Sequence, residues 1–185
     1  MADTGWVLPG TGANRPISAN KDWTNPDRVT ADDSARANVF DDSPAFSDGL
    51  AASNFDFSAI LSGATIDGIE IEVEVYNSSG AGVEWALLKL ILSDDSDGTE
   101  DKKAVMTTPW PGIPTTEQAG GASDLWSETI ASSDVKDIDW GFSLQVEFVT
   151  ASPNALVDSM KMKVYYTPPI PQILATGHLQ QVIRF

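Results

Sequence analysis

The fold of this chain is decided by the stretch Ile69-Glu70-Ile71-Glu72-Val73-Glu74-Val75-Tyr76. Apolar and acidic residues alternate strictly along it, and successive side chains of an extended strand point to opposite faces. The pattern therefore predicts a β-strand with one face in a core and its glutamates facing solvent or a partner. The turn-forming sequence GATIDG at 63–68 predicts a turn or bulge at the start of this strand.

Three other segments carry clear strand patterns. Residues 84–92 are apolar on both alternating faces, which predicts a strand with the core on one side and another segment or another chain on the other. Residues 142–148 alternate Phe, Leu, Val and Phe with polar residues. Residues 160–166 alternate Met, Met, Val and Tyr with Lys, Lys and Tyr. The last two patterns predict amphipathic strands.

Several weaker patterns complete the secondary-structure prediction. Residues 35–40, 50–57 and 103–106 are further strand candidates, and residues 132–137 predict one helical turn capped by Ser132 or Ser133. Many short strands without a sustained helical period favour an all-β fold. We therefore expect an antiparallel β-sandwich or jelly-roll-like single domain.

The chain divides into three parts by composition. Residues 1–34 are rich in Gly, Pro, Asn and Asp, which predicts an irregular N-terminal segment packed on the domain. Residues 35–167 form the predicted β-sandwich domain. Residues 168–185 begin with prolines at 168, 169 and 171. Prolines remove the donors of a strand ladder and favour an extended path, so the domain is expected to end at Thr167.

Residues 168–185 are predicted to be a Pro-rich linker followed by a C-terminal docking arm. The arm is too apolar for a solvated tail, so we expect either a neighbouring subunit or its own domain to cover it. The residues expected to contact the partner are Ile173, Leu174, Leu179, Val182, Ile183 and Phe185.

Composition excludes several classes of partner and site. The net charge is −16, from 27 acidic and 11 basic residues, so a nucleic-acid backbone would be repelled. The chain has no cysteine, which excludes disulfides, thiolate metal sites and a cysteine nucleophile. No stretch approaches the roughly 18 apolar residues of a membrane span. We expect a soluble protein with no nucleic-acid or membrane partner.

The sequence carries no recognisable catalytic motif. Its one histidine, His178, lies in the arm, and no nucleophile elbow, phosphate-binding loop or paired-histidine zinc motif is present. A glycosidase needs two carboxylates that face each other in a cleft, and abundant acidic residues do not supply that arrangement by themselves. We therefore expect no enzymatic activity, no catalytic residue, no cofactor and no metal site, with a hydrolase as a rival hypothesis.

The acidic loop at residues 94–101 raises the question of calcium, because carboxylate oxygens at alternating positions suit that ion. Aligning Gly98 with the sixth position of an EF-hand loop places Ser93 at the first position and Ala104 at the twelfth. The twelfth position requires a carboxylate. The loop is therefore predicted to be an exposed connection without an obligatory metal.

Tryptophans provide the other candidate ligand contacts. Trp85 and Trp110 are possible ligand aromatics that could stack on sugars, as in a carbohydrate-binding sandwich. The alternative is that they pack in the core or at its rim, the commoner place for aromatic residues of all-β domains.

Several segments together resemble a small β-sandwich domain of tailed-bacteriophage virion structural proteins and related prophage products. The family usually has glycine at the position of Ser127, and the arm lies outside the resemblance. The matching segments, in order, are WTNP at 23–26, FDF at 55–57, SGATIDGIEIEV at 62–73, GGASDLW at 120–126 and VDSMKMKVYY at 157–166.

The resemblance implies a non-enzymatic accessory subunit of a phage particle, either a capsid decoration (cement) protein or a protein attached to the neck or tail. Its implied partners are capsid, neck or tail subunits and further copies of itself. Its implied location is the virion, after synthesis in the host bacterial cytoplasm. The alternative is a carbohydrate-binding β-sandwich for recognition of the host surface.

Overall fold

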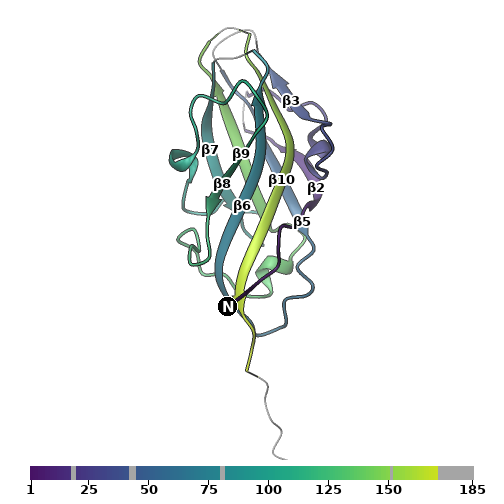
Figure 1. Cartoon of the computed structure of the whole chain (residues 1–185), viewed down its shortest axis with the longest axis vertical. Coiled ribbons are helices and arrows are strands. Elements are labelled where there is room, and N and C mark those ends of the chain that lie inside the picture. The colour runs from purple at the N-terminus through teal and green to yellow at the C-terminus, as the bar shows by residue number, and fades with distance from the viewer. Residues whose placement is uncertain (18–19, 42–44, 80–81, 151, 171–185) are drawn as a thin grey trace, which may run out of the picture.

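The computed structural model describes residues 1–17, 20–41, 45–79, 82–150 and 152–170. Two antiparallel β-sheets pack face to face and form an elongated sandwich (Figure 1). The helices of the described residues are three short 3-10 turns, η1 (Pro26–Val29), η2 (Lys103–Val105) and η3 (Asp134–Lys136). The predicted all-β antiparallel sandwich is confirmed.

The first sheet is built around the longest strands of the chain. Strand β10 (Asn154–Thr167) pairs with β6 (Thr65–Asn77), and β6 pairs with β8 (Thr115–Gly120). The opposite edge of β10 pairs with β3 (Ala37–Phe40) near its beginning and with β1 (Ala2–Asp3) near its end. The N-terminus therefore lies at the end of the sandwich where β10 finishes (Figure 1).

The second sheet is organised around β9 (Gly141–Phe148). One edge of β9 pairs with β7 (Val83–Ile91) along its whole length. The other edge pairs with β5 (Gly49–Phe55) and then with β4 (Ala45–Phe46). Strand β2 (Pro9–Arg15) extends the sheet beyond β5. Every one of these pairings is antiparallel.

The core lies between β6 and β10 of one sheet and β9 and its neighbours of the other. The predicted inward faces are confirmed, because each of the following residues is 0% exposed: Ile69, Ile71, Val73, Val75, Phe142, Leu144, Val146 and Val164. The alternation along β6 therefore identified both the strand and its buried face.

A β-bulge interrupts β10 beside β6. Val157 pairs with Val75 and Met160 pairs with Val73, so Asp158 and Ser159 together stand opposite the single residue between those partners. An extra residue of this kind shifts the phase of the strand, which lets Val157 and Met160 both point into the core. Asp158 and Ser159 are each 2% exposed.

The prediction of an irregular N-terminal segment is wrong over β2. This strand reads PGTGANR and has low intrinsic strand propensity, so pairing with β5 must fix it in the sheet. Its Gly12 permits η1 to pack closely, since a Cβ atom there would lie 2.3 Å from the carbonyl oxygen of Pro26. Tertiary contact therefore overrides the composition of this segment.

Two local predictions also need correction. Residues 103–106 do not form a strand, because Lys103–Val105 is the 3-10 turn η2. The helical turn predicted near 132–137 exists as η3, and Ser133 occupies its N-cap position. The Ser133 side chain makes no capping hydrogen bond to the backbone there. Its hydroxyl lies instead 3.4 Å from Oδ1 of Asp134.

The outer face of the second sheet is covered in part by the chain itself. Ser143 and Gln145 alternate with the core residues of β9, yet both are buried, and Gln145 Nε2 donates to the carbonyl oxygen of Ser47 at 2.8 Å. Leu87 of β7 and Ser143 border a hollow closed by Arg15 and its neighbours. The outward residues of β7, among them Leu87 and Lys89, are half-buried, so its own chain covers this strand only in part.

The chain leaves the sandwich beyond β10. Thr167 and Pro168 are exposed, and Ile170 is 91% exposed (Figure 1). The arm residues Ile173, Leu174, Leu179, Val182, Ile183 and Phe185, together with His178, lie outside the described residues. Their docking remains a prediction.

Candidate functional site

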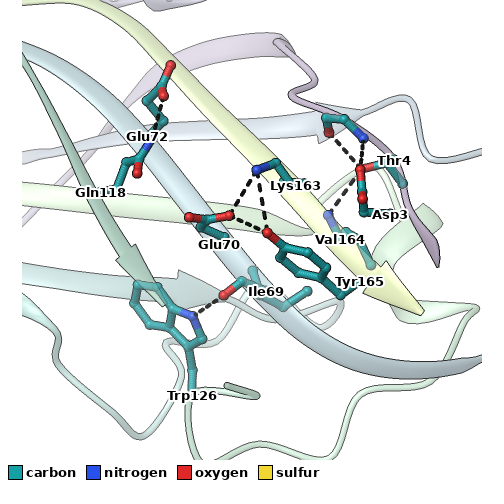
Figure 2. A network of polar contacts seen from close by, with 11 residues as sticks. Asp3, Thr4, Ile69, Glu70, Glu72, Gln118, Trp126, Lys163, Val164 and Tyr165 are labelled. Carbon is teal, nitrogen blue, oxygen red and sulfur yellow. Dashed lines mark hydrogen bonds and ion pairs between the residues drawn. The ribbon is translucent and has the colours of Figure 1, made fainter. Parts of the chain in front are cut away.

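The outer face of the first sheet carries an ion-pair ladder, formed by Glu70, Glu72 and Glu74 of β6 with two lysines of β10 and with Arg36, which directly precedes β3. Lys163 Nζ lies 3.0 Å from Glu70 Oε2 (Figure 2). Lys161 Nζ lies 3.0 Å from Glu72 Oε1. Arg36 Nη2 lies 3.3 Å from Glu74 Oε1. The strand register puts each lysine directly opposite its glutamate. The predicted outward face therefore consists of half-buried, internally paired carboxylates.

Aromatic side chains close one end of the ladder. Tyr165 Oη donates to Glu70 Oε2 at 2.6 Å, beside the contact with Lys163 (Figure 2). Lys163 Nζ also lies 4.0 Å from the ring centre of Trp6, a cation–π contact. This contact ties the segment between β1 and β2 to the sheet. The ladder is thus fixed by its own chain and offers no unpaired cation to a ligand at this end.

The pKa values of the two lysines of the ladder are raised by their partners. Burial acts to lower the pKa of Lys163, but its hydrogen bonds to Glu70 and Tyr165 outweigh burial and raise that pKa above 10.5. The pKa of Lys161 is raised in the same way by Asp32 and Glu72, against the effect of burial. The pKa of Tyr165 is raised chiefly by its hydrogen bond to Glu70.

These shifts predict loss of stability in alkali. A raised pKa means that the folded state holds the proton more tightly, so the contribution is complete below about pH 10.4 and disappears as pH rises through the raised values. Each half-exposed pair contributes about 0.5–1 kcal/mol. We expect urea unfolding at pH 9 to 11.5 to show a steeper loss of stability for the wild type than for K161M/K163M. If the stability of the wild type and of K161M/K163M fell in parallel with pH, the alkaline loss of stability could not be attributed to Lys161 and Lys163.

The loop after β8 is anchored by a buried indole. Trp126 is 1% exposed, and its Nε1 donates to the carbonyl oxygen of Ile69 at 3.1 Å (Figure 2). Asp124 accepts from the backbone N–H of Trp126 at 2.9 Å and forms an ion pair with Lys102 at 2.8 Å. Ser127 has a φ of 59°, the left-handed conformation that glycine adopts most readily. This cluster therefore fixes the loop on the edge of β6.

Trp85 and Trp110, for which ligand contact and core packing were the alternatives, are core residues. Trp85 is 5% exposed and Trp110 is 1% exposed, and their ring centres lie 4.9 Å apart. Trp85 Nε1 donates to the carbonyl oxygen of Thr107 at 3.1 Å. Neither indole presents a face on which a sugar could stack, so of the two alternatives core packing is the one that the structure supports.

The acidic loop after β7 is held by the N-terminal segment. The Arg15 guanidinium contacts Asp95, and its Nε lies 3.2 Å from Asp97 Oδ1. Asp94 accepts hydrogen bonds from the hydroxyl and backbone N–H of Ser96, and both lower the pKa of Asp94. The side chains of 94–97 are exposed, as predicted for this connection. Its carboxylates are therefore engaged by protein donors.

Three surface hollows are lined by more than one carboxylate, the feature that the hydrolase hypothesis requires. One of them, of about 230 Å³, is lined by Asp95 and Asp139. A hollow of about 410 Å³ contains Asp95 and Asp97, both bound to Arg15. A hollow of about 190 Å³ contains Asp94, Glu128 and Asp134. Glu128 accepts from the N–H of Thr99 and Asp134 from that of Ala131. A general acid needs a raised pKa, whereas that of Asp94 is lowered.

A further acidic group lies where the ladder meets the bulge of β10. Asp32, Glu74 and Asp158 bring carboxylate oxygens within 4.8 Å of one another. Sequence reasoning missed this group, because its members are far apart along the chain. One signal was present: the apolar alternation changes phase between Val157 and Met160, which indicates a bulge.

No helix among the described ranges has the length and apolar character needed to cross a membrane. A scan of protein-family models, a search of curated proteins and a search of solved structures each found no match.

Proposed function

We propose that this chain is a non-enzymatic accessory subunit of a tailed-bacteriophage particle, a capsid decoration (cement) protein or a subunit attached to the neck or tail. The proposal starts from the resemblance of the segments at 23–26, 55–57, 62–73, 120–126 and 157–166 to virion β-sandwich domains. Its partners would be capsid, neck or tail subunits and further copies of the chain, and its location the virion.

The observation that carries the proposal is the way in which the chain leaves the sandwich. The core cluster consists of buried residues between Trp23 and Val164, and both sheets contribute to it. Beyond it, Pro168 and Ile170 are exposed and lead toward the apolar sequence of 173–185. Prolines stiffen an extended exit path. This arrangement supports a folded body that presents a separate apolar arm to a neighbour.

The surface of the body supports a structural role over a catalytic one. The glutamates of the ladder are paired with Arg36, Lys161 and Lys163. Among the carboxylates that line the hollows, Asp94, Asp95, Asp97, Glu128 and Asp134 accept hydrogen bonds from their own chain or form ion pairs with it. A general base must reach a substrate proton, and groups engaged in this way are poorly placed to do so. Strong negative charge supports solubility before assembly.

Quantitative mass spectrometry of purified particles tests the proposal. Cells that carry the gene and its phage or prophage are induced, and the particles are purified on a gradient. We expect peptides of this chain in the particle fraction. About six or twelve copies per particle would place it at the neck or tail, and hundreds would place it on the capsid. Its absence from intact particles, together with binding on a glycan array, would instead support the carbohydrate-binding alternative.

A further inference from the structure

We propose that Asp32, Glu74 and Asp158 bind a divalent cation, with Ca²⁺ preferred. One carboxylate oxygen of each residue lies within 4.8 Å of the other two. Calcium binds oxygen ligands at about 2.3–2.6 Å, so oxygens around one ion are separated by up to about 5 Å. The spacing of the three carboxylates therefore matches a shared calcium ion, with water completing its coordination.

The burial of Asp158, with one carboxylate oxygen lacking a partner, is the independent observation that points to a ligand. Asp158 is 2% exposed, and its Oδ2 accepts from the backbone N–H of Ser34 at 3.1 Å. Its Oδ1 is buried and has no hydrogen-bond partner among the described residues. A buried carboxylate oxygen without a partner is unfavourable, and nearly all such atoms in proteins find one. A cation held with Asp32 and Glu74 supplies that partner.

The fold brings the three ligands together from separate segments. Glu74 lies on β6 opposite the bulge that carries Asp158. The segment at 30–36 runs beside β10 there, where Thr30 bridges Ser159 of the bulge. That segment carries Asp32. A bound cation would therefore fasten the segment at 30–36 to both central strands of the first sheet.

The neighbouring cations leave room for a metal ion. Arg36 contacts Glu74 through Oε1, and Lys161 contacts Asp32 through Oδ2. The second oxygen of each of these carboxylates has no ion pair or hydrogen bond with the described part of the chain. Three carboxylates against two cations leave a net negative charge. Because the two cations oppose a metal, we expect a dissociation constant on the order of 10⁻⁴ M.

Calcium is favoured over magnesium by the irregularity of the site. Magnesium demands nearly ideal octahedral geometry and gives up water reluctantly, whereas calcium accepts variable geometry and ligand number. The three ligands come from a loop, a regular strand position and a bulge, and Asp32 is half exposed. Such a set is better suited to the more tolerant ion.

The test uses the full chain after treatment with EDTA and dialysis. Calorimetric titration with CaCl₂ should show one saturable site, and 10 mM CaCl₂ should raise Tm by about 5–10 °C, as expected for a ligand near 100 times its dissociation constant. MgCl₂ should give a smaller shift. D158N should abolish the calcium shift, and D32N, on a half-exposed side chain, provides the same test if D158N does not fold. D95N in the acidic loop is the matched control and should keep the shift.

The proposal is overturned if the wild type shows no saturable calcium binding and no rise in Tm. It is equally overturned if D158N and D32N retain the shift, or if D95N removes it, because binding would then lie elsewhere. Arg36 Nε is also buried without a partner, so a direct Arg36–Asp158 pair is the competing arrangement. That arrangement predicts stability that is indifferent to calcium.

Discussion

The V73D variant is expected to be largely unfolded at room temperature. Val73 is 0% exposed on β6, between Met160 of β10 and Glu117 of β8 in the strand register. A carboxylate placed there loses its hydration without gaining a partner, which costs several kcal/mol. A domain of ordinary stability has about 5–15 kcal/mol in total. Circular dichroism during thermal unfolding would show a loss of the cooperative transition or a Tm lower by tens of degrees.

The matched control places the same charge on an exposed strand position. Thr11 lies on the edge strand β2 with its side chain exposed, so T11D should change stability by no more than about 0.5 kcal/mol. Equal Tm values for the wild type and V73D would contradict the assignment of the β6 face to the core. A large effect of T11D would show that added negative charge, and not its burial, destabilises this acidic chain.

The G120A variant is expected to lose about 3–5 kcal/mol, from a left-handed backbone and a broken hydrogen bond together. Gly120 ends β8 with a φ of 86°. A Cβ atom there would lie 2.2 Å from the carbonyl oxygen of Ile69 and 2.8 Å from Trp126 Nε1. These are the two atoms of the hydrogen bond that anchors the Trp126 loop. Urea unfolding measures the loss directly.

The neighbouring glycine supplies the control for G120A. A Cβ atom on Gly121 would meet no other atom within 4 Å, and its backbone N–H donates to Ile69 O, which alanine preserves. We therefore expect G121A to be within about 0.5 kcal/mol of the wild type. If both variants lose stability equally, the effect comes from ordering the loop in general and not from the close approach at Gly120.

The parts of the fold that were predicted from sequence are those with strong alternation. Strands β6, β9 and β10 each bury apolar residues at every second position. This alternation was sufficient to identify them as strands. Strand β2 was missed because its sequence has no apolar alternation, and its stability comes from pairing with β5 and packing against η1. These contacts join segments that are distant in the sequence, so the local pattern of residues could not reveal them.

The candidate site was only partly visible in the sequence. The outward glutamates of β6 could be assigned a face, and Lys161 and Lys163 have the same spacing, but their pairing depends on the register between two strands, whose paired residues are 89 and 93 positions apart. Core or rim packing of Trp85 and Trp110 could be expected from the usual place of aromatic residues, but the choice between packing and ligand contact needed the structure. Asp158 required both the bulge and the overlying segment at 30–36 to become buried.

Co-sedimentation with particles tests the central claim that the sandwich is a carrier for a C-terminal docking arm. Particles that lack this protein are mixed with the full chain or with a chain ending at Ile170, then separated on a gradient. We predict that the full chain sediments with the particles, and that the shortened chain keeps its Tm within a few degrees but stays at the top of the gradient. Equal binding of both chains, or unfolding of the shortened chain while the full chain is a monomer, would contradict the account.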